Sequence, residues 1–219
     1  SIITKFYYPY DLDSISNITS SETLTLNKLI AYNRLTEVVE KTEKLKYKNL
    51  DEAVELSSIR FHFKSFDQHI IAPEKTFTKK GSFDKEHRIT YHSYDSYGNP
   101  LEVSKSDGPL IFYLWGYHGQ YPIAKIENTT EAALESELGL LKNVNESDLQ
   151  SINNLRSNSA FKEAMITTFT YKPLVGMTVM TDPRGRTTTY EYDDFGRLEI
   201  VKDHEGKLLE EYEYHYKGE

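Results

Sequence analysis

The chain has 219 residues, of which 38% are hydrophobic, and it contains 17 tyrosines and 10 phenylalanines against a single tryptophan. Its formal net charge of −8 argues against nucleic acid or an anionic membrane as a partner, because binders of phosphate concentrate Lys and Arg. The lack of cysteine excludes disulfides, thiolate metal sites and a cysteine nucleophile, and no run of eighteen apolar residues is present to span a bilayer.

Residues 1–87 are predicted as an irregular β region with one short helix, at the start of an array. Ser20 or Ser21 is expected to cap a helix over residues 22–32, where leucines recur. Alternating segments at 34–41 and 58–66 predict strands separated by polar connections.

Residues 88–128 are predicted as a repeat-like hairpin followed by an aromatic block. The block contains Trp115, Tyr117 and Tyr121, which flank two glycines in a tight turn. Aromatic rings of this kind stack on sugars, so the block is a candidate glycan-binding site. A core plug is the favoured interpretation, because large aromatic side chains dominate protein cores.

Residues 129–163 are predicted as a helical hairpin inserted into the β array. Leucines and an isoleucine recur at three and four residues in two runs, preceded by caps at Thr130 and Asn145. An insertion on one face of an array is a usual place for a binding surface. The favoured alternative is a decoration that covers a sheet edge, because exposed edges need covering.

Residues 164–219 repeat themselves with a period near twenty. Asp182 and Gly185 return 21 residues later as Asp203 and Gly206, and TYEYDDFGRLEIVKDHEG reads as strand, turn, strand and turn. A strand is predicted over Thr187–Tyr192, and a last strand is predicted to continue through Tyr212, Tyr214 and Tyr216. Such a period indicates an array whose units must stack to bury their apolar faces.

A similar pattern of tyrosine, aspartate and glycine occurs earlier, in YHSYDSYGNPLEVSKSDG. The residues that we expect to carry the repeat structurally are Tyr94, Asp95, Gly98, Gly185, Arg186, Tyr190, Tyr192, Asp193, Gly196, Arg197, Asp203, Gly206, Tyr212 and Tyr214.

Catalytic chemistry is not expected. The seven histidines show no ligand spacing, and the adjacent acids Asp193 and Asp194 face opposite sides of a strand. A turn aspartate such as Asp193 is better explained as an acceptor for backbone amides. We therefore predict no enzyme activity, no metal and no cofactor.

The segment TYEYDDFGRLEIVKDHEG resembles the YD repeat of bacterial RHS proteins, and residues 111–128 and 168–187 resemble companion blocks of RHS-type surface proteins exported by type IX secretion systems. The resemblance implies a mainly β fold, a spiral shell of stacked antiparallel β-hairpins, with the helical hairpin as an insertion. It implies a secreted or cell-surface location. The implied partners are upstream repeats of the same chain and a secretion translocon or other outer-membrane components.

Two alternatives come with the same resemblance. The chain would be part of a cocoon that encloses and delivers a toxin, or a carbohydrate-binding adhesin module. An open end of such an array exposes strand edges, so we also expect the isolated chain to aggregate or to need a capping partner.

Overall fold

The computed structural model describes residues 1–48, 52–66 and 69–215, and it is mainly β, as predicted. The chain divides into two compact units, Ser1–Gly108 and Pro109–Glu219. In each unit every strand pairs antiparallel with the strand that follows it in sequence. This is the arrangement expected of consecutive hairpins.

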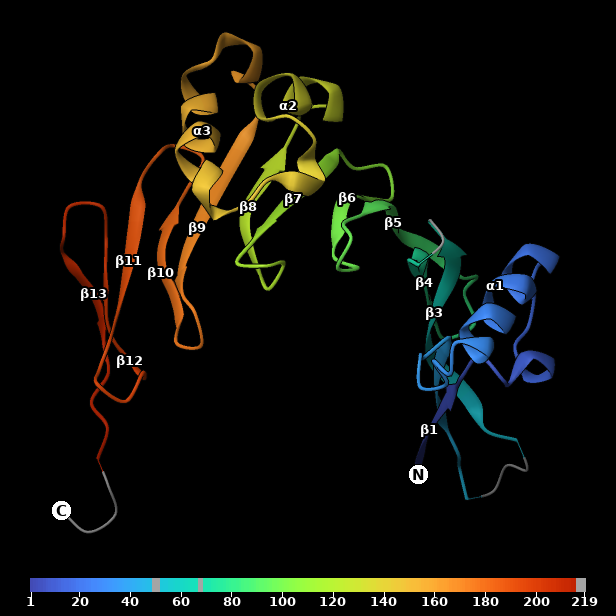
Figure 1. The fold of residues 1–219 in the computed structure, drawn as a ribbon. Coiled ribbons are helices and arrows are strands. Elements are labelled where there is room, and N and C mark those ends of the chain that lie inside the picture. The colour runs from blue at the N-terminus through green and yellow to red at the C-terminus, as the bar shows by residue number, and fades with distance from the viewer. Residues whose placement is uncertain (49–51, 67–68, 216–219) are drawn as a thin grey trace. The chain divides into compact units, whose positions relative to one another are not determined.

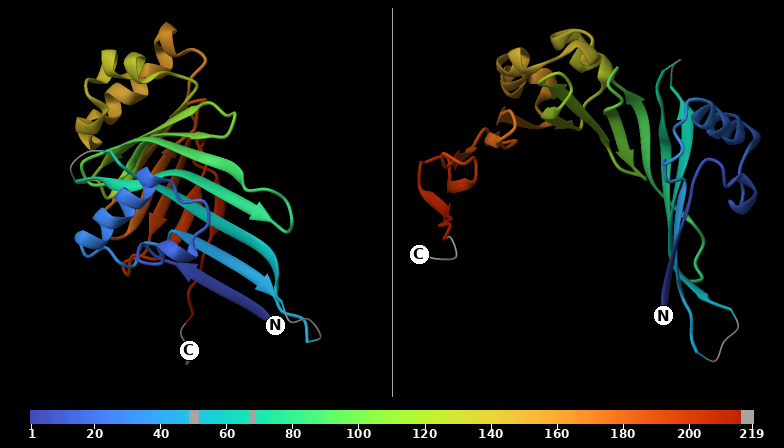
Figure 2. Two further views of the ribbon diagram at one scale, coloured as in Figure 1. Left: turned by 90° about the vertical axis from the view of Figure 1, so that its right-hand side faces the viewer. Right: turned by 60° about the horizontal axis from the view of Figure 1, so that its bottom comes forward.

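Among its described residues, the first unit has six strands, one α-helix and a 3-10 turn at Leu12–Ser14, and Figures 1 and 2 show its ribbon. The strands are β1 (Ile2–Tyr7), β2 (Glu40–Leu45), β3 (Val54–Ser65), β4 (Ile71–Lys80), β5 (Glu86–Tyr94) and β6 (Pro100–Lys105). Helix α1 (Ser20–Ala31) contacts β3 and buries Leu26 and Leu29 against Phe63, which forms the core of this unit.

Two details of the first unit differ from the sequence prediction. Helix α1 is capped by the Thr19 hydroxyl, which accepts a hydrogen bond from the Glu22 amide, rather than by Ser20 or Ser21. The strand expected from Arg34 begins only at Glu40. The Arg34 side chain instead binds Glu37 and the carbonyl oxygen of Ile71, which ties the segment after α1 to β4.

The described part of the second unit, up to residue 215, has seven strands with a helical insertion between the second and third (Figure 1). The strands are β7 (Leu110–Gly116), β8 (Tyr121–Glu127), β9 (Met165–Lys172), β10 (Gly176–Thr181), β11 (Thr187–Tyr192), β12 (Leu198–Lys202) and β13 (Leu208–Glu211). The insertion contains α2 (Glu131–Leu138), α3 (Leu149–Asn154) and the 3-10 turns Leu141–Asn143, Glu146–Asp148, Leu155–Ser157 and Ser159–Phe161.

The insertion covers a sheet face, not an edge as we predicted. Strand β8 is paired on both sides, with β7 and β9, so it presents no open edge to the helices. Leu134 and Ile152 of the insertion are fully buried together with Phe112 and Ile126 of the strands. The expected caps are present, since Thr130 caps α2 and Asn145 caps the 3-10 turn before α3.

The strands after β9 have almost no core of their own. Every residue of β10 and β11 is partly exposed, and in β12 only Val201 is buried. The last strand, β13, is exposed throughout and ends at Glu211, so it is shorter than predicted. Tyr212 and Tyr214 follow it without regular structure, and Tyr216 lies outside the described residues. These hairpins depend on local contacts, which the turns provide.

Candidate functional site

Four turns of the described chain share one hydrogen-bond pattern. They begin at Asp95, Asp182, Asp193 and Asp203. In each turn the aspartate Oδ1 accepts the backbone N–H groups of the second and fourth residues after it, at 2.8–2.9 Å. The aspartate N–H donates to the carbonyl four residues on, at 2.9 Å. One carboxylate oxygen therefore satisfies two amides of a tight hairpin loop.

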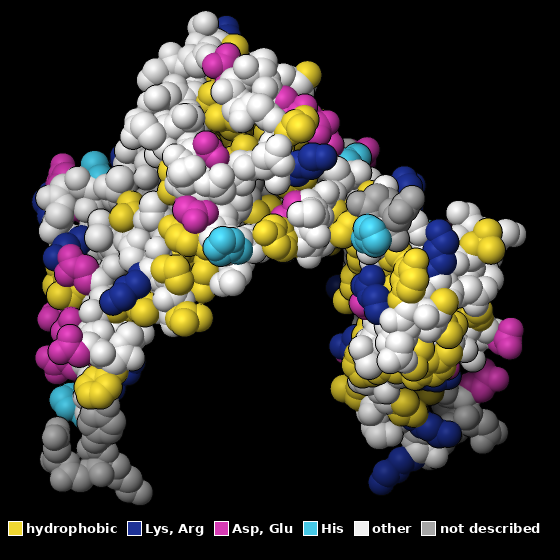
Figure 3. Space-filling view, viewed as in Figure 1, with side chains coloured by type: hydrophobic (Ala, Val, Ile, Leu, Met, Phe, Trp, Pro, Cys, Tyr) yellow, Lys and Arg dark blue, Asp and Glu magenta, His cyan; other side chains and the backbone are white. Residues whose placement is uncertain are grey.

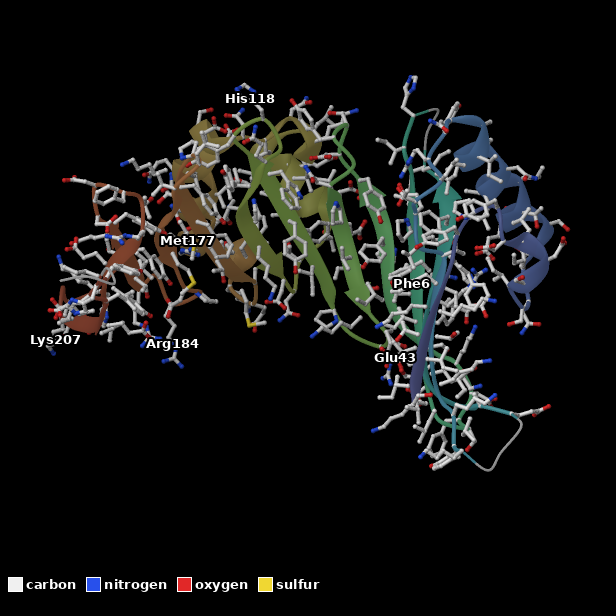
Figure 4. The ribbon with its side chains drawn as sticks, turned by 90° about the horizontal axis from the view of Figure 1, so that it is seen from below. Phe6, Glu43, His118, Met177, Arg184 and Lys207 are labelled. Carbon is white, nitrogen blue, oxygen red and sulfur yellow. The ribbon has the colours of Figure 1, made fainter. Side chains whose placement is uncertain are left out.

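The fourth residue of each turn is a glycine in the left-handed region. The φ angles are 86° at Gly98, 79° at Gly185, 74° at Gly196 and 78° at Gly206. A type I turn followed by a glycine at positive φ is a common three-residue hairpin loop, and its extra residue is a β-bulge. Arg184 and Lys207 lie in the second and fourth of these turns (Figure 4).

The fifth residue of each turn decides whether the aspartate is also ion-paired. Arg186 and Arg197 bridge the second oxygen of their aspartates, Asp182 and Asp193, each at 2.7 Å. In the first turn the Asn99 amide takes this place, and in the fourth Lys207 turns to Glu205 instead. Backbone donation by the fifth residue is the main cause that lowers the pKa of Asp182, Asp193 and Asp203.

Three repeat tyrosines each hydrogen-bond back to an earlier strand: Tyr94 on β5 to β4, Tyr192 on β11 to β10, and Tyr214, which follows β13, to β12. The hydroxyl of Tyr94 donates to Pro73 O at 2.6 Å, that of Tyr192 to Met177 O at 2.8 Å, and that of Tyr214 to Leu198 O at 2.7 Å. Each acceptor lies at or near the first residue of its strand. Burial raises the pKa of the Tyr94 and Tyr192 hydroxyls, so both phenols stay protonated as donors.

Residues 177–207 match the family model of the RHS Repeat. The chain carries an RHS repeat. The matched residues span the turns at Asp182, Asp193 and Asp203, whose geometry is described above. No curated protein matches the chain.

The remaining side chains that we predicted to carry the repeat connect these turns to the tyrosines. Arg197 packs its guanidinium over the rings of Phe195, at 5.2 Å, and Tyr214, at 4.3 Å. Tyr190 is half-buried on β11. Tyr212 donates its amide to Glu199 O and its hydroxyl to the Glu210 carboxylate. Arg197 thereby joins one repeat to the tyrosine of the next.

The aromatic block before the RHS repeat is a tyrosine cluster. The Tyr117 ring meets Tyr121 at 5.6 Å and Tyr171 of β9 at 5.8 Å, edge to face, and Tyr121 stacks on Tyr171 at 4.7 Å. The Tyr117 oxygen accepts the Tyr171 amide and the Tyr121 oxygen accepts the Leu174 amide. Trp115 is half-buried on β7. Sequence reasoning missed Tyr171, although it lies in the segment that resembled a companion block.

A glycine and a glutamate that sequence reasoning also missed attach the insertion to the β7–β8 turn. Glu146 Oε2 accepts the Tyr117 amide at 2.6 Å, and this bond is the main cause that lowers the Glu146 pKa. A Cβ on Gly116 would lie 2.6 Å from Ile123 and 3.0 Å from Glu146. Residue 116 at the end of β7 therefore has to be glycine, because a larger residue would collide with these neighbours.

The first unit contains a buried ion pair that the sequence did not reveal. Arg60 Nη2 lies 2.7 Å from Glu22 Oε1, and both side chains are less than 5% exposed. Burial raises the pKa of Glu22 and lowers that of Arg60. Burial, with Arg60 nearby, also lowers the pKa of His62 to about 4.

The described residues contain no cluster of three or more His, Cys, Asp or Glu side chains that could hold a metal ion. In the same part of the chain, no helix is both long and apolar enough to cross a membrane.

Proposed function

We propose that the chain is a structural RHS-repeat module of a secreted bacterial surface protein, and that it performs no chemistry of its own. The observation that carries this is the coupling of successive hairpins: the Tyr192 and Tyr214 hydroxyls each donate to a backbone carbonyl of an earlier strand, and Arg197 stacks on Tyr214. Because every unit fastens its neighbour, the module would hold a long β structure in register without a core in each repeat.

The repeat aspartates support a structural role over a catalytic one. Oδ1 of each of the three RHS-repeat aspartates is occupied by two backbone amides, and Asp182 and Asp193 are also ion-paired. A carboxylate held in this way has a lowered pKa and is a poor proton donor at neutral pH. The oxygens of Tyr117 and Tyr121 likewise bind backbone amides, which supports a packing role for the aromatic block over glycan binding.

The finer part of the proposal is that the module is exported by a type IX secretion translocon. Its support is the resemblance of residues 111–128 and 168–187 to blocks of proteins exported in this way. A fluorescent reporter fused upstream of residues 1–219 should reach the medium only in cells with a working type IX system.

The matched control for export is the same fusion with Asp182, Asp193 and Asp203 changed to Ala, which removes the three turn acceptors and leaves chain length unchanged. We expect this variant to be retained. Equal export of the wild-type fusion in cells with and without the system would contradict the translocon proposal, while the structural role would stand on the stability measurements below.

A further inference from the structure

The ion pair of Glu22 and Arg60 belongs to a block of polar side chains enclosed between α1 and the sheet. In the register of β2 and β3, Glu40 lies opposite Arg60, and Thr42 lies opposite Ser58. Residues that lie opposite each other, or two apart on one strand, point to the same face of a sheet. These four side chains therefore share one face, and α1 contacts β3 and places Glu22 against Arg60 there.

The polar groups of this block are enclosed more completely than their hydrogen bonds explain. The exposed fractions are 4% for Glu22, 2% for Arg60, 6% for Thr42 and 3% for Ser58, whereas dark blue and magenta spheres in Figure 3 show other charged side chains at the surface. Within the part of the chain that the structure describes, four buried atoms of the block have no hydrogen bond to a protein group: Glu22 Oε2, Arg60 Nη1, Thr42 Oγ1 and Ser58 Oγ. Folded proteins satisfy nearly all such groups, with protein or with ordered water.

The charges of the block match water better than an ion. Glu40 is paired with Lys85 at 2.6 Å, so the block contains two carboxylates and two cations and has no formal net charge. A bound cation would meet Arg60 and Lys85, and a bound anion would meet the two glutamates. Water both donates and accepts, so it can bind a carboxylate oxygen, a guanidinium N–H and hydroxyls at once.

The spacing within the block also suits water. Cα atoms of directly opposed residues lie about 4.5–5.5 Å apart, and the hydroxyls of Thr42 and Ser58 do not bond to each other. Two hydrogen bonds of about 2.8 Å through one water span such a gap. In the ion pair, Glu22 Oε1 and Arg60 Nη2 form a single bond, which leaves Oε2 and Nη1 to a second water.

We propose that this block is a hydration site, in which resident water bridges Thr42 to Ser58 and Glu22 to Arg60. The water supplies the partners that the protein does not, so a buried ion pair can fasten α1 to β3. This inference concerns the first unit and does not depend on the proposed role of the RHS repeat.

Two threonine variants of the full 219-residue chain test the site by the sign of their effect. The Thr76 hydroxyl is also buried without a partner, but Phe61 and Ile89 lie opposite it, so water there would have too few polar partners. Thr76→Val removes an unsatisfied hydroxyl and should raise the urea midpoint. Thr42→Val removes a partner of bound water and should lower it. A rise in both variants would overturn the proposal.

Oxygen-17 magnetic relaxation dispersion detects the long-lived water itself. The wild type should show a larger dispersion amplitude than the double variant Thr42→Val/Ser58→Ala, and Thr76→Val should match the wild type. Equal amplitudes in the wild type and the folded double variant would overturn the proposal. Relaxation of ²³Na or ³⁵Cl that is faster with the wild type than with the double variant would overturn it in favour of a bound ion. If circular dichroism shows the double variant to be unfolded, the signs of the two single variants still decide.

Discussion

Replacing Gly176 by alanine should destabilise the second unit through a single contact, that with Tyr192. A Cβ at residue 176 would lie 2.2 Å from Tyr192 Oη and 2.7 Å from Cζ. The φ angle at residue 176 is not positive, so the backbone conformation itself does not require glycine. The phenol would have to leave, and its hydrogen bond to Met177 O, 2.8 Å long, would be lost.

The magnitude follows from two losses and one gain in the free energy of unfolding. A lost hydrogen bond costs about 0.5–1.5 kcal/mol, and forcing an extra methyl into an occupied space costs about 1–3 kcal/mol. Removing glycine from a strand returns about 0.5–1 kcal/mol. We expect Gly176→Ala to lower the free energy of unfolding by about 1–3 kcal/mol on balance.

A double-mutant cycle in urea isolates the contact. With Tyr192→Ala present, the space is empty and Gly176→Ala should be neutral or slightly stabilising. Gly185→Ala is the matched control, because its Cβ would meet nothing within 4 Å while its φ of 79° is strained for alanine, and its cost should not depend on residue 192. An equal cost of Gly176→Ala in both backgrounds would refute the steric reasoning.

Four further predictions concern the turns and the buried charges. Asp193→Ala should lower the urea midpoint more than Asp203→Ala, because Asp193 also binds Arg197; equal shifts would contradict the ranking. Because the pKa values of Asp182, Asp193 and Asp203 are lowered in the fold, their stabilisation is complete above about pH 4. It is lost as pH falls through the folded values, so the urea midpoint should decline below pH 4, and less steeply with all three changed to Asn. His62, with a folded pKa of about 4, should stay neutral to that pH by NMR; it should add stability above about pH 6.5 that is lost between 6.5 and 4, and titration near 6.5 would show that it is not buried. Glu22→Gln should cost about 3–5 kcal/mol by leaving Arg60 buried without its partner, whereas Lys64→Met, at an exposed pair, should cost under about 1 kcal/mol.

Much of the repeat could be predicted because its determinants are local. A turn aspartate, a glycine three residues on and alternating strands act within about ten residues of chain, so β11 was predicted with its observed bounds. The helical insertion could also be predicted from the sequence, because Thr130 is a helix cap and the leucines after it recur with helical spacing. The strand expected from Arg34 failed because a distant contact, with Ile71 O, holds that segment.

The sequence by itself determined the mainly β hairpin fold, since turn chemistry and a short period specify antiparallel neighbours without reference to the rest of the chain. Only the tertiary structure decided which side chains fasten the hairpins. The acceptors of Tyr94, Tyr192 and Tyr214 lie 15 to 21 residues away. Every residue has a backbone carbonyl, so the amino-acid sequence does not indicate which carbonyl accepts a given tyrosine hydroxyl. The buried pair of Glu22 and Arg60, 38 residues apart, could not be predicted either. Its two side chains meet and lose contact with water only when α1 packs on β3.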